Sequence, residues 1–218
     1  MNRLAILGAS GHGKVVADTA ECCGWKVIDF FDDAWPQPNR IGAWQVVGDT
    51  TLLKSRLQVY DGVLVAIGNN HIRHRKLLEL EAAGGRLCSL VHPAATVSRY
   101  AVLRSGSVVF AGAVINADAL IGRGAIINTA SSVDHDCVLG DGVHVSPGAR
   151  LAGGVKVGDL SWVGIGASVR QLVQIGTRVT VGAGAVVTSD IADLLTVVGV
   201  PAKALCKRNV PKDYPLGC

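Results

Sequence analysis

Large aliphatic side chains recur at every sixth position through the second half of the chain. Seventeen consecutive positions spaced six apart, from Val91 to Val187, each hold Val, Ile or Leu. If these three residue types filled about three positions in ten, a chance run of this length would have odds on the order of one in a billion. The position four residues further on, from Ala95 to Ala185, holds only small residues or Val. Two side chains of each repeat are therefore expected to point into a core.

A period of six fits neither an α-helix, which repeats about every 3.6 residues, nor a strand, which alternates every two. It predicts short extended faces that meet at corners, and three such faces make a coil of about eighteen residues. Residues 91–190 have room for roughly five and a half stacked coils. Glycine follows the large aliphatic residue at 122, 140, 158, 164, 176 and 182, which indicates corners or close packing there.

Residues 1–89 carry a different pattern, in which short apolar runs alternate with helical segments. We expect strands at 4–7, 27–31 and 62–67, and helices that end near residues 23 and 83. Strands that alternate with helices in this way form a parallel sheet. The first part of the chain is therefore predicted to be a small Rossmann-like α/β domain.

A polar cluster follows each of the three predicted strands. The clusters are G-A-S-G-H-G at 8–13, D-D at 32–33 and G-N-N at 68–70. In parallel α/β sheets, ligands bind beyond the carboxyl ends of the strands. Glycines let backbone N–H groups approach a pyrophosphate, and an acidic pair accepts hydrogen bonds from a ribose or a base. We therefore expect a nucleotide here, although the G-x-x-G-x-G spacing differs from the G-x-G-x-x-G fingerprint and disfavours a redox dinucleotide.

Composition and charge narrow the functional classes. An apolar fraction of 49% excludes a disordered chain, and 27 glycines with 5% aromatic residues suit tight corners around a thin core. The net charge of +4 is spread along the chain, which argues against nucleic-acid binding, and we interpret the H-I-R-H-R-K run at 71–76 as a solvated helix face. No apolar run approaches the roughly 20 residues of a membrane span and no signal peptide is evident, so we expect a cytoplasmic protein. The six cysteines form no repeated C-x-x-C pair and are expected to be reduced.

Two histidines within the repeats are candidates for chemistry. His135 and His144 both lie off the inward positions, so we expect them at corners or on outer faces. Histidine suits acid–base chemistry near pH 7 because its pKa lies close to that pH. Asp134 and Asp136 flank His135, and the sequence leaves open which carboxylate orients its ring. The two histidines are nine residues apart, half of a predicted coil, so one site that uses both would need two chains.

The repeat and the polar clusters together resemble a known family. The six-residue period and the closing segment V-G-V-P-A-K at 198–203 resemble the hexapeptide-repeat acyltransferases. The order G-A-S-G-H-G, D-D, A-I-G-N-N and V-H-P before the repeat resembles the bacterial nucleotide-sugar N-acetyltransferases, over residues 3 to about 205. The likeness is greatest to the acetyltransferases of UDP-4-amino-4,6-dideoxy sugars in protein glycosylation, in the bacillosamine pathway, with sialic acid O-acetyltransferases as further relatives.

This resemblance implies an architecture and a reaction. The α/β domain at 1–89 would bind the nucleotide sugar, and residues 90–218 would form a left-handed parallel β-helix that ends in a C-terminal tail. The enzyme would be a homotrimer with its active site between neighbouring chains. It would transfer acetyl from acetyl-CoA, without a metal, to the 4-amino group of a UDP-linked 4-amino-4,6-dideoxy sugar in a ternary complex.

The family pattern also assigns roles to residues. It makes His135 the general base and Asp136 the carboxylate that tunes it. Acetyl-CoA would contact His144, Ile165 and Ala183. The nucleotide sugar would contact Ser10, Gly11, His12, Asp32, Asp33 and Gly68, with Asn69, Asn70 and Arg73 as further candidates.

Other interpretations stay open. A γ-type carbonic anhydrase shares the β-helix, but its metal needs three histidines and the coils offer two. A catalytically silent protein would bind the nucleotide sugar without releasing CoA. Among enzymes, the acceptor can instead be sialic acid or another surface sugar, acetylated on oxygen, or GDP-perosamine, acetylated on nitrogen.

Overall fold

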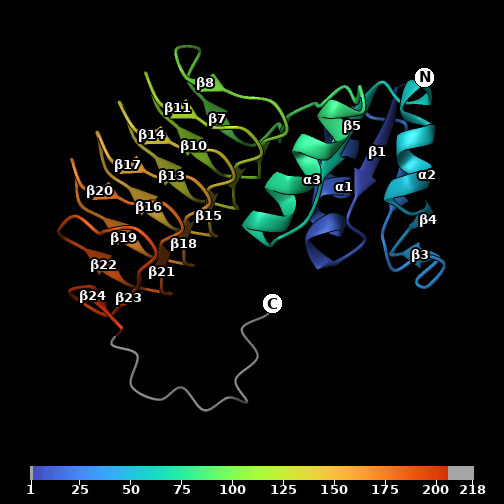
Figure 1. Ribbon diagram of the computed structural model, residues 1–218. Helices are drawn as coiled ribbons and strands as arrows, with labels where there is room; N and C mark the ends of the chain where they lie inside the picture. Colours follow the sequence, from blue (N-terminus) through green and yellow to red (C-terminus); the bar gives the residue numbers. More distant parts are fainter. Residues whose placement is uncertain (1, 206–218) are drawn as a thin grey trace.

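The computed structural model describes residues 2–205. Residues 206–218, where we expected a C-terminal tail, lie outside the described residues. Figure 1 shows an α/β unit beside a long stack of short strands, with helix α3 (Asn70–Ala82) between the N-terminal sheet and the stack. The two hydrophobic patterns of the sequence correspond to these two parts.

The first part is a five-stranded sheet with three α-helices and one 3-10 helix. Its elements are β1 (Arg3–Leu7), α1 (Gly11–Cys22), β2 (Val27–Phe31), β3 (Arg40–Ile41), β4 (Trp44–Gly48), α2 (Thr50–Ser55), η1 (Leu57–Val59), β5 (Gly62–Val65) and α3. The order is β3-β4-β2-β1-β5, and all pairs except β3-β4 are parallel. Alternate side chains of β1 enter different cores: Leu4 and Ile6 pack with α1, whereas Ala5 and Leu7 pack with α2 and α3.

The three strands and two helices expected in this part are present, with ends within about three residues of the prediction. Strands β3 and β4 and helices α2 and η1 were not predicted. In strand β4 only Val46 and Gly48 are buried, so the strand lacks a clear alternation of apolar and polar residues. Helix α2 does carry a readable start signal, because the carboxylate of Asp49 caps the N–H of Leu52 at 2.8 Å.

The second part is a parallel β-helix whose strands fall into three sheets. The first sheet contains β7 (Thr96–Val97), β10 (Val114–Ile115), β13 (Ser132–Val133), β16 (Arg150–Leu151), β19 (Ser168–Val169) and β22 (Val186–Val187). The second contains β8 (Val102–Leu103), β11 (Leu120–Ile121), β14 (Val138–Leu139), β17 (Lys156–Val157) and β20 (Gln174–Ile175). The third contains β6 (Leu90–Val91), β9 (Val108–Val109), β12 (Ile126–Ile127), β15 (His144–Val145), β18 (Trp162–Val163), β21 (Thr180–Val181), β23 (Thr196–Val198) and the antiparallel β24 (Lys203–Ala204).

Strand pairing in the stack follows the predicted eighteen-residue coil. Ile126 pairs with His144, His144 with Trp162, and Trp162 with Thr180. The predicted inward aliphatic residues from Val109 to Val187 are each at most 3% exposed. The first members of the series are less buried because no coil covers the open end of the stack. Burial of this aliphatic column is the main driving force that holds successive coils together.

Corners recur every six residues, each at a residue with positive φ. The series runs through 106, 112, 118, 124, 130, 136, 142, 148, 154, 160, 166, 172, 178 and 184. Eight of these fourteen are glycine, and the others include Asp136 and Leu160. The six glycines noticed in the sequence form a different set. A Cβ on Gly122, for example, would collide with the backbone of the next coil at Gly140, so these glycines permit close packing rather than turns.

The two parts share a core. Leu4, Ile6 and Val16 of the α/β unit pack in one cluster with Phe110 and Ile126 of the third sheet. The third sheet therefore faces the N-terminal domain, which covers its first coils (Figure 1). Within residues 2–205, no helix is both long enough and apolar enough to cross a membrane.

Candidate functional site

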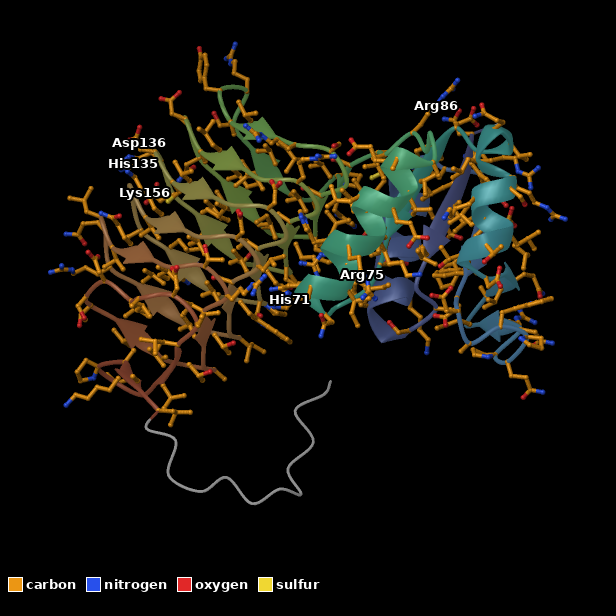
Figure 2. All side chains as sticks on the ribbon, viewed as in Figure 1. His71, Arg75, Arg86, His135, Asp136 and Lys156 are labelled. Atoms are coloured by element: carbon orange, nitrogen blue, oxygen red, sulfur yellow. The ribbon has the colours of Figure 1, made fainter. Side chains whose placement is uncertain are left out.

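His135 and Asp136 form a hydrogen-bonded pair at the corner between β13 and β14. Nδ1 of His135 lies 2.6 Å from Oδ2 of Asp136, and the two side chains are 63% and 65% exposed. Figure 2 shows both residues at the edge of the β-helix that lies away from the N-terminal domain. The hydrogen bond to Asp136 raises the pKa of His135. An imidazole held at Nδ1 presents Nε2 as its free nitrogen.

The geometry distinguishes the two acids that flank His135. Asp134 accepts hydrogen bonds from Asn116 Nδ2 and from the backbone N–H of His135, each at 2.8 Å. These bonds, led by the one from Asn116, lower the pKa of Asp134. Asp136 has φ of 59°, which breaks the alternation of an extended chain and brings its carboxylate to the same side as the ring. Asp136 is therefore the carboxylate in contact with the imidazole.

His144, Ile165 and Ala183, the expected acetyl-CoA contacts, line one cavity of about 380 Å³. The rest of its wall comes from Ser146, Pro147, Trp162, Gly164, Thr180, Val181 and Gly182. It lies along β15, β18 and β21 and the corners that follow them. The structure thus brings together three residues that are far apart in the sequence.

His144 is more enclosed than its outward position suggested. It is 7% exposed, and its ring stacks on Trp162 with centroids 5.1 Å apart and planes at 16°. Burial lowers its pKa to about 3, with further contributions from Arg73 and His12. Asn128 Nδ2 lies 3.1 Å from Nε2, and Asn128 Oδ1 already accepts from Thr129, so the amide donates to Nε2. His144 is then neutral, with a proton on Nδ1, which has no hydrogen-bond partner in the described structure.

His135 and the cavity occupy different parts of one chain. His135 follows the first sheet of the β-helix, whereas the cavity lies on the third sheet and the corners after it. This agrees with the expectation that the two histidines lie on different faces. Within a single chain the candidate base does not line the cavity.

The glycine-rich turn after β1 is held by Asp32. Its carboxylate accepts from the backbone N–H of Ala9 at 2.7 Å and from that of Ala34 at 2.9 Å. Ser10 is the N-cap residue of α1, but its hydroxyl makes no capping bond. Ser10 and Gly11 are exposed at the carboxyl end of β1. Asp32 thus shapes the loop that presents them.

Asp33 contacts both α2 and α3. It accepts from the backbone N–H of Thr50 at 3.0 Å and from Lys76 Nζ at 2.7 Å. Burial alone would raise the pKa of Asp33, but the bonds from Lys76 and Thr50 lower it to about 2. Lys76, in the run that we interpreted as a solvated helix face, is instead only 14% exposed.

His12 lies at the junction with the β-helix. Its ring meets Phe110 edge to face, with centroids 5.7 Å apart. Burial, followed by the charge of Arg73, lowers the pKa of His12 to about 4. Its Nε2 is buried and has no hydrogen-bond partner within residues 2–205. The neutral ring therefore keeps one buried nitrogen without a partner among the described residues.

The segment after β5 is bound to the β-helix through α3. Asn69 caps the helix by accepting from Ile72, while Asn70 Nδ2 donates to the carbonyls of Leu160 and Ser161. Arg73 is 1% exposed. Its five hydrogen bonds go to the carbonyls of Ile67, Gly68, Gly124 and Gly142 and to Asn70 Oδ1. This burial contradicts the solvated-face interpretation for Arg73 and argues against direct ligand contact by Asn70 and Arg73.

The chain is similar over nearly its whole length to solved acetyltransferases. The acetyltransferase domain of PglB from Neisseria gonorrhoeae FA1090, in complex with acetyl coenzyme A, is 45% identical, covers 94% of this chain and 100% of its own, and has a TM-score of 0.90. A mutant of perosamine N-acetyltransferase from Caulobacter crescentus, in complex with CoA and GDP-perosamine, is 40% identical, with 94% and 98% covered and a TM-score of 0.90. The chain belongs to this family of nucleotide-sugar N-acetyltransferases.

Two shorter matches agree with this assignment. The family model of the PglD N-terminal domain matches residues 3–80. UDP-N-acetylbacillosamine N-acetyltransferase from Bacillus subtilis (strain 168) is 36% identical over 113 residues, which are 51% of this chain and 52% of that protein. The match thus spans about half the length of this curated relative. The full-length structural matches confirm the predicted fold class, an α/β unit followed by a left-handed parallel β-helix.

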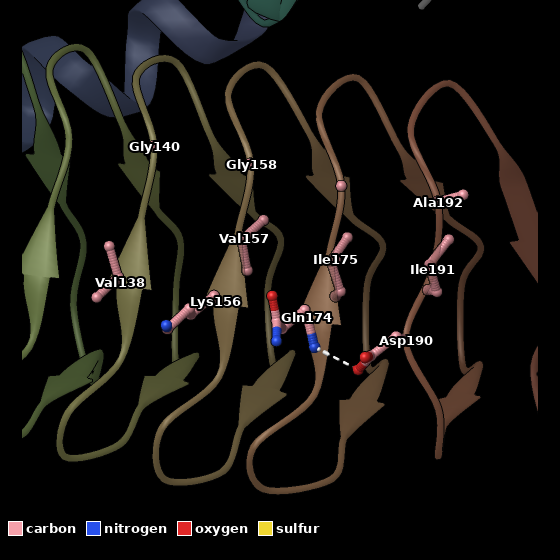
Figure 3. A pocket seen from close by; sticks show the side chains of 11 residues that line it. Val138, Gly140, Lys156, Val157, Gly158, Gln174, Ile175, Asp190, Ile191 and Ala192 are labelled. Carbon is pink, nitrogen blue, oxygen red and sulfur yellow. Dashed lines mark hydrogen bonds between the residues drawn. The ribbon is translucent and has the colours of Figure 1, made fainter.

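This N-acetyltransferase has a second groove, on the second sheet of the β-helix. Its volume is about 660 Å³, which is larger than that of the His144 cavity, and none of the predicted site residues lines it. Figure 3 shows Lys156, Gln174 and Asp190 on it, with the backbone N–H of Gln174 bonded to Asp190 Oδ1 at 2.8 Å. The described residues contain no cluster of three or more His, Cys, Asp or Glu side chains that could hold a metal ion.

Two residues at the cavity were not predicted from the sequence: Trp162, which is part of its wall, and Asn128, which lies beside it. Trp162 forms the stacking partner of His144, and Asn128 sets its tautomer. Trp162 was within reach of the pattern, because it stands eighteen residues, one coil, after His144. Asn128 follows the strand that pairs with β15, so its approach depends on corner geometry that the period does not encode.

Proposed function

We propose that this N-acetyltransferase transfers acetyl from acetyl-CoA to the 4-amino group of a UDP-linked 4-amino-4,6-dideoxy sugar. The observation that carries the proposal is the His135–Asp136 pair, which lies on the β-helix of a chain that matches acetyltransferases over 94% of its length. The curated relative, UDP-N-acetylbacillosamine N-acetyltransferase, supports a UDP-linked acceptor.

His135 acts as the general base through Nε2. The amine nitrogen attacks the thioester carbonyl and forms a tetrahedral intermediate, while the proton that the amine loses moves to Nε2. Asp136 stabilises the imidazolium that results, because its carboxylate lies 2.6 Å from Nδ1. Collapse of the intermediate breaks the C–S bond, and the imidazolium returns the proton to the departing thiolate. The products are the N-acetylated sugar and CoA.

The cavity around His144 suits the thioester end of acetyl-CoA. Its wall is mostly apolar, and the buried Nδ1–H of His144 is a donor without a partner within the described residues. A thioester or an amide carbonyl of the pantetheine arm would satisfy that donor. Ile165 and Ala183 lie beside it and contribute surface rather than charge.

The nucleotide sugar binds at the carboxyl ends of β1, β2 and β5 in this proposal. The expected contacts are Ser10, Gly11, His12, Asp32, Asp33 and Gly68. Ser10 and Gly11 supply exposed groups at the start of α1, and His12 Nε2 has no hydrogen-bond partner within the described residues. A diphosphate at this helix N-terminus is favoured by the helix dipole.

A homotrimer would complete the site. His135 and the His144 cavity lie on different faces of one chain, so the base of one subunit is proposed to meet the cavity of its neighbour. Mixing His135→Ala subunits with His144→Ala subunits tests this directly. Mixed trimers should regain activity that neither variant has alone, whereas a site within one chain would give none.

GDP-perosamine is the second candidate acceptor. It is favoured by the 40% identity to perosamine N-acetyltransferase, which was solved with CoA and GDP-perosamine. One assay decides between the two: release of CoA thiol from acetyl-CoA with UDP-linked 4-amino-4,6-dideoxy sugars and with GDP-perosamine in parallel. If no nucleotide-linked amino sugar supports turnover, or if His135→Ala matches the parent, the proposed function is wrong.

A further inference from the structure

We propose that Gly153 is a positioning residue that seats the imidazole of His135. This inference rests on the proposed function, since it concerns the orientation of the proposed base. A Cβ built on Gly153 would lie 2.5 Å from both Cε1 and Nε2 of His135 and 3.2 Å from Cδ2. The ring therefore occupies the space that any other residue at 153 would fill.

The backbone does not itself require glycine at this position. Gly153 is absent from the residues with positive φ, in contrast to its neighbour Gly154 at 69°. The three heavy atoms nearest to the hypothetical Cβ all belong to His135, and none is backbone. Glycines such as Gly122, whose Cβ would strike the next coil's main chain, are constrained by the fold. Gly153 is constrained by one catalytic side chain.

The repeat offers an internal comparison. Gly153 stands two residues after an inward aliphatic, and the same repeat position occurs fifteen times between 99 and 183. Every other occurrence carries a side chain. They are Arg99, Ser105, Ala111, Ala117, Arg123, Thr129, His135, Asp141, Pro147, Asp159, Ile165, Gln171, Thr177 and Ala183. Glycine occurs at this repeat position only one coil below the proposed base.

The seat and the carboxylate hold the ring from two sides. The carboxylate of Asp136 is hydrogen-bonded to Nδ1 of His135, and the ring lies over Gly153. Gly153 is buried although it stands at a corner. The backbone N–H of Gly154 donates to the carbonyl of His135 at 2.9 Å, which fixes the two coils relative to each other. The hydrogen bond to Asp136 and the space left open at Gly153 together allow the ring its observed orientation. The direction of Nε2 is thereby set before the substrate arrives.

The test is Gly153→Ala, with Gln171→Ala as the matched control at the same repeat position one coil further on. Displacing the ring should lower kcat by roughly a hundredfold, because a misplacement of about 1 Å can have that effect, while KM for acetyl-CoA stays near the parent value. The NMR titration of His135 should move to lower pH, since the ring leaves Asp136, which with Asp134 is the charge that faces it. Gln171→Ala should change neither quantity.

Controls separate seating from folding. In a His135→Ala background, Gly153→Ala should have no further effect on residual activity or on Tm, because the space is then free. If Gly153→Ala alone fails to fold, normal folding of this double variant would still identify the ring as the obstacle, and failure of both would overturn the proposal. Parent-like kcat and an unchanged His135 titration in Gly153→Ala would also overturn it. The titration needs no substrate, so it tests the seat even if the assayed sugars give no turnover.

Discussion

Replacing Arg73 by Met should loosen the attachment of α3 to the β-helix. Gly124, Gly142 and Leu160 are corner residues of three successive coils, and their carbonyls form a column that faces the first turn of the helix. Arg73 bonds the first two and Asn70 bonds the third. The same guanidinium holds the carbonyls that precede the helix, in the loop proposed to contact the nucleotide sugar.

The magnitude follows from what the substitution leaves behind. Four backbone carbonyls would lose the only donors that they have among the described contacts. The bonds to Gly124 and Gly142 are buried and those to Ile67 and Gly68 are partly buried, and a buried acceptor left without a partner costs about 1–3 kcal/mol. Part of this loss is offset, because burial of the cation, which lowers the pKa of Arg73 to about 9, is also unfavourable. We expect a net loss of about 3 kcal/mol, which for a chain of this size lowers Tm by roughly 6–12 °C.

The assay combines thermal unfolding with amide hydrogen exchange in residues 67–73. Arg75→Met is the control, because Arg75 is exposed on the same helix and makes no described hydrogen bond or ion pair. Arg73→Met should accelerate exchange in this segment and raise KM for the nucleotide sugar more than KM for acetyl-CoA. A Tm within about 1 °C of the Arg75→Met variant would refute the reasoning, since it would mean that the five bonds contribute nothing net.

Four further outcomes are expected. His135→Ala should lower kcat by roughly a hundredfold to ten-thousandfold. Asp136→Asn should move the acidic limb of the kcat/KM profile to lower pH, because Asp136 raises the pKa of His135, and a limb that stays in place would contradict this. Trp162→Ala should raise KM for acetyl-CoA by roughly tenfold, or about 1.4 kcal/mol, without changing KM for the sugar, as initial-rate kinetics can show. Asp33→Asn should flatten acid unfolding between about pH 4 and 2: the depressed pKa means that the Asp33–Lys76 pair stabilises the native state above pH 4 and is lost as pH falls towards 2, so an unaltered unfolding curve would contradict it.

The period of six predicted the β-helix because its core is made by local sequence alone. Each coil contributes the same inward positions, and pairing between coils follows from stacking. The N-terminal sheet was predicted less completely. β1, β2 and β5 are apolar runs, whereas β3 has no buried residue and β4 buries only Val46 and Gly48, so neither strand carries a readable apolar pattern.

For the candidate site residues, the sequence indicated the chemistry of the side chains but not their surroundings. The exposure of His135 follows from its place off the inward positions, but contact with Asp136 depends on the left-handed φ of one corner. The burial of His144 and Arg73 depends on contacts between parts of the chain that are remote in sequence. The prediction that the H-I-R-H-R-K run is a solvated helix face was wrong for Arg73 and Lys76 for the same reason. On a helix such a run faces several directions, and only one of them meets the column of corner carbonyls.

The repeat also explains why function can concentrate on a few corners without weakening the fold. His135, Gly153, Ile165 and Ala183 all stand two residues after an inward aliphatic, next to the positive-φ residue of their corner. The residues that build the core stand at the aliphatic position and four residues after it, where burial is nearly complete. Substitution at the corner position therefore changes what the β-helix presents outward and leaves its core volume unchanged. For that reason His135→Ala is expected to keep the parent's free energy of unfolding, and a loss of activity in this variant can be assigned to the chemistry of the corner.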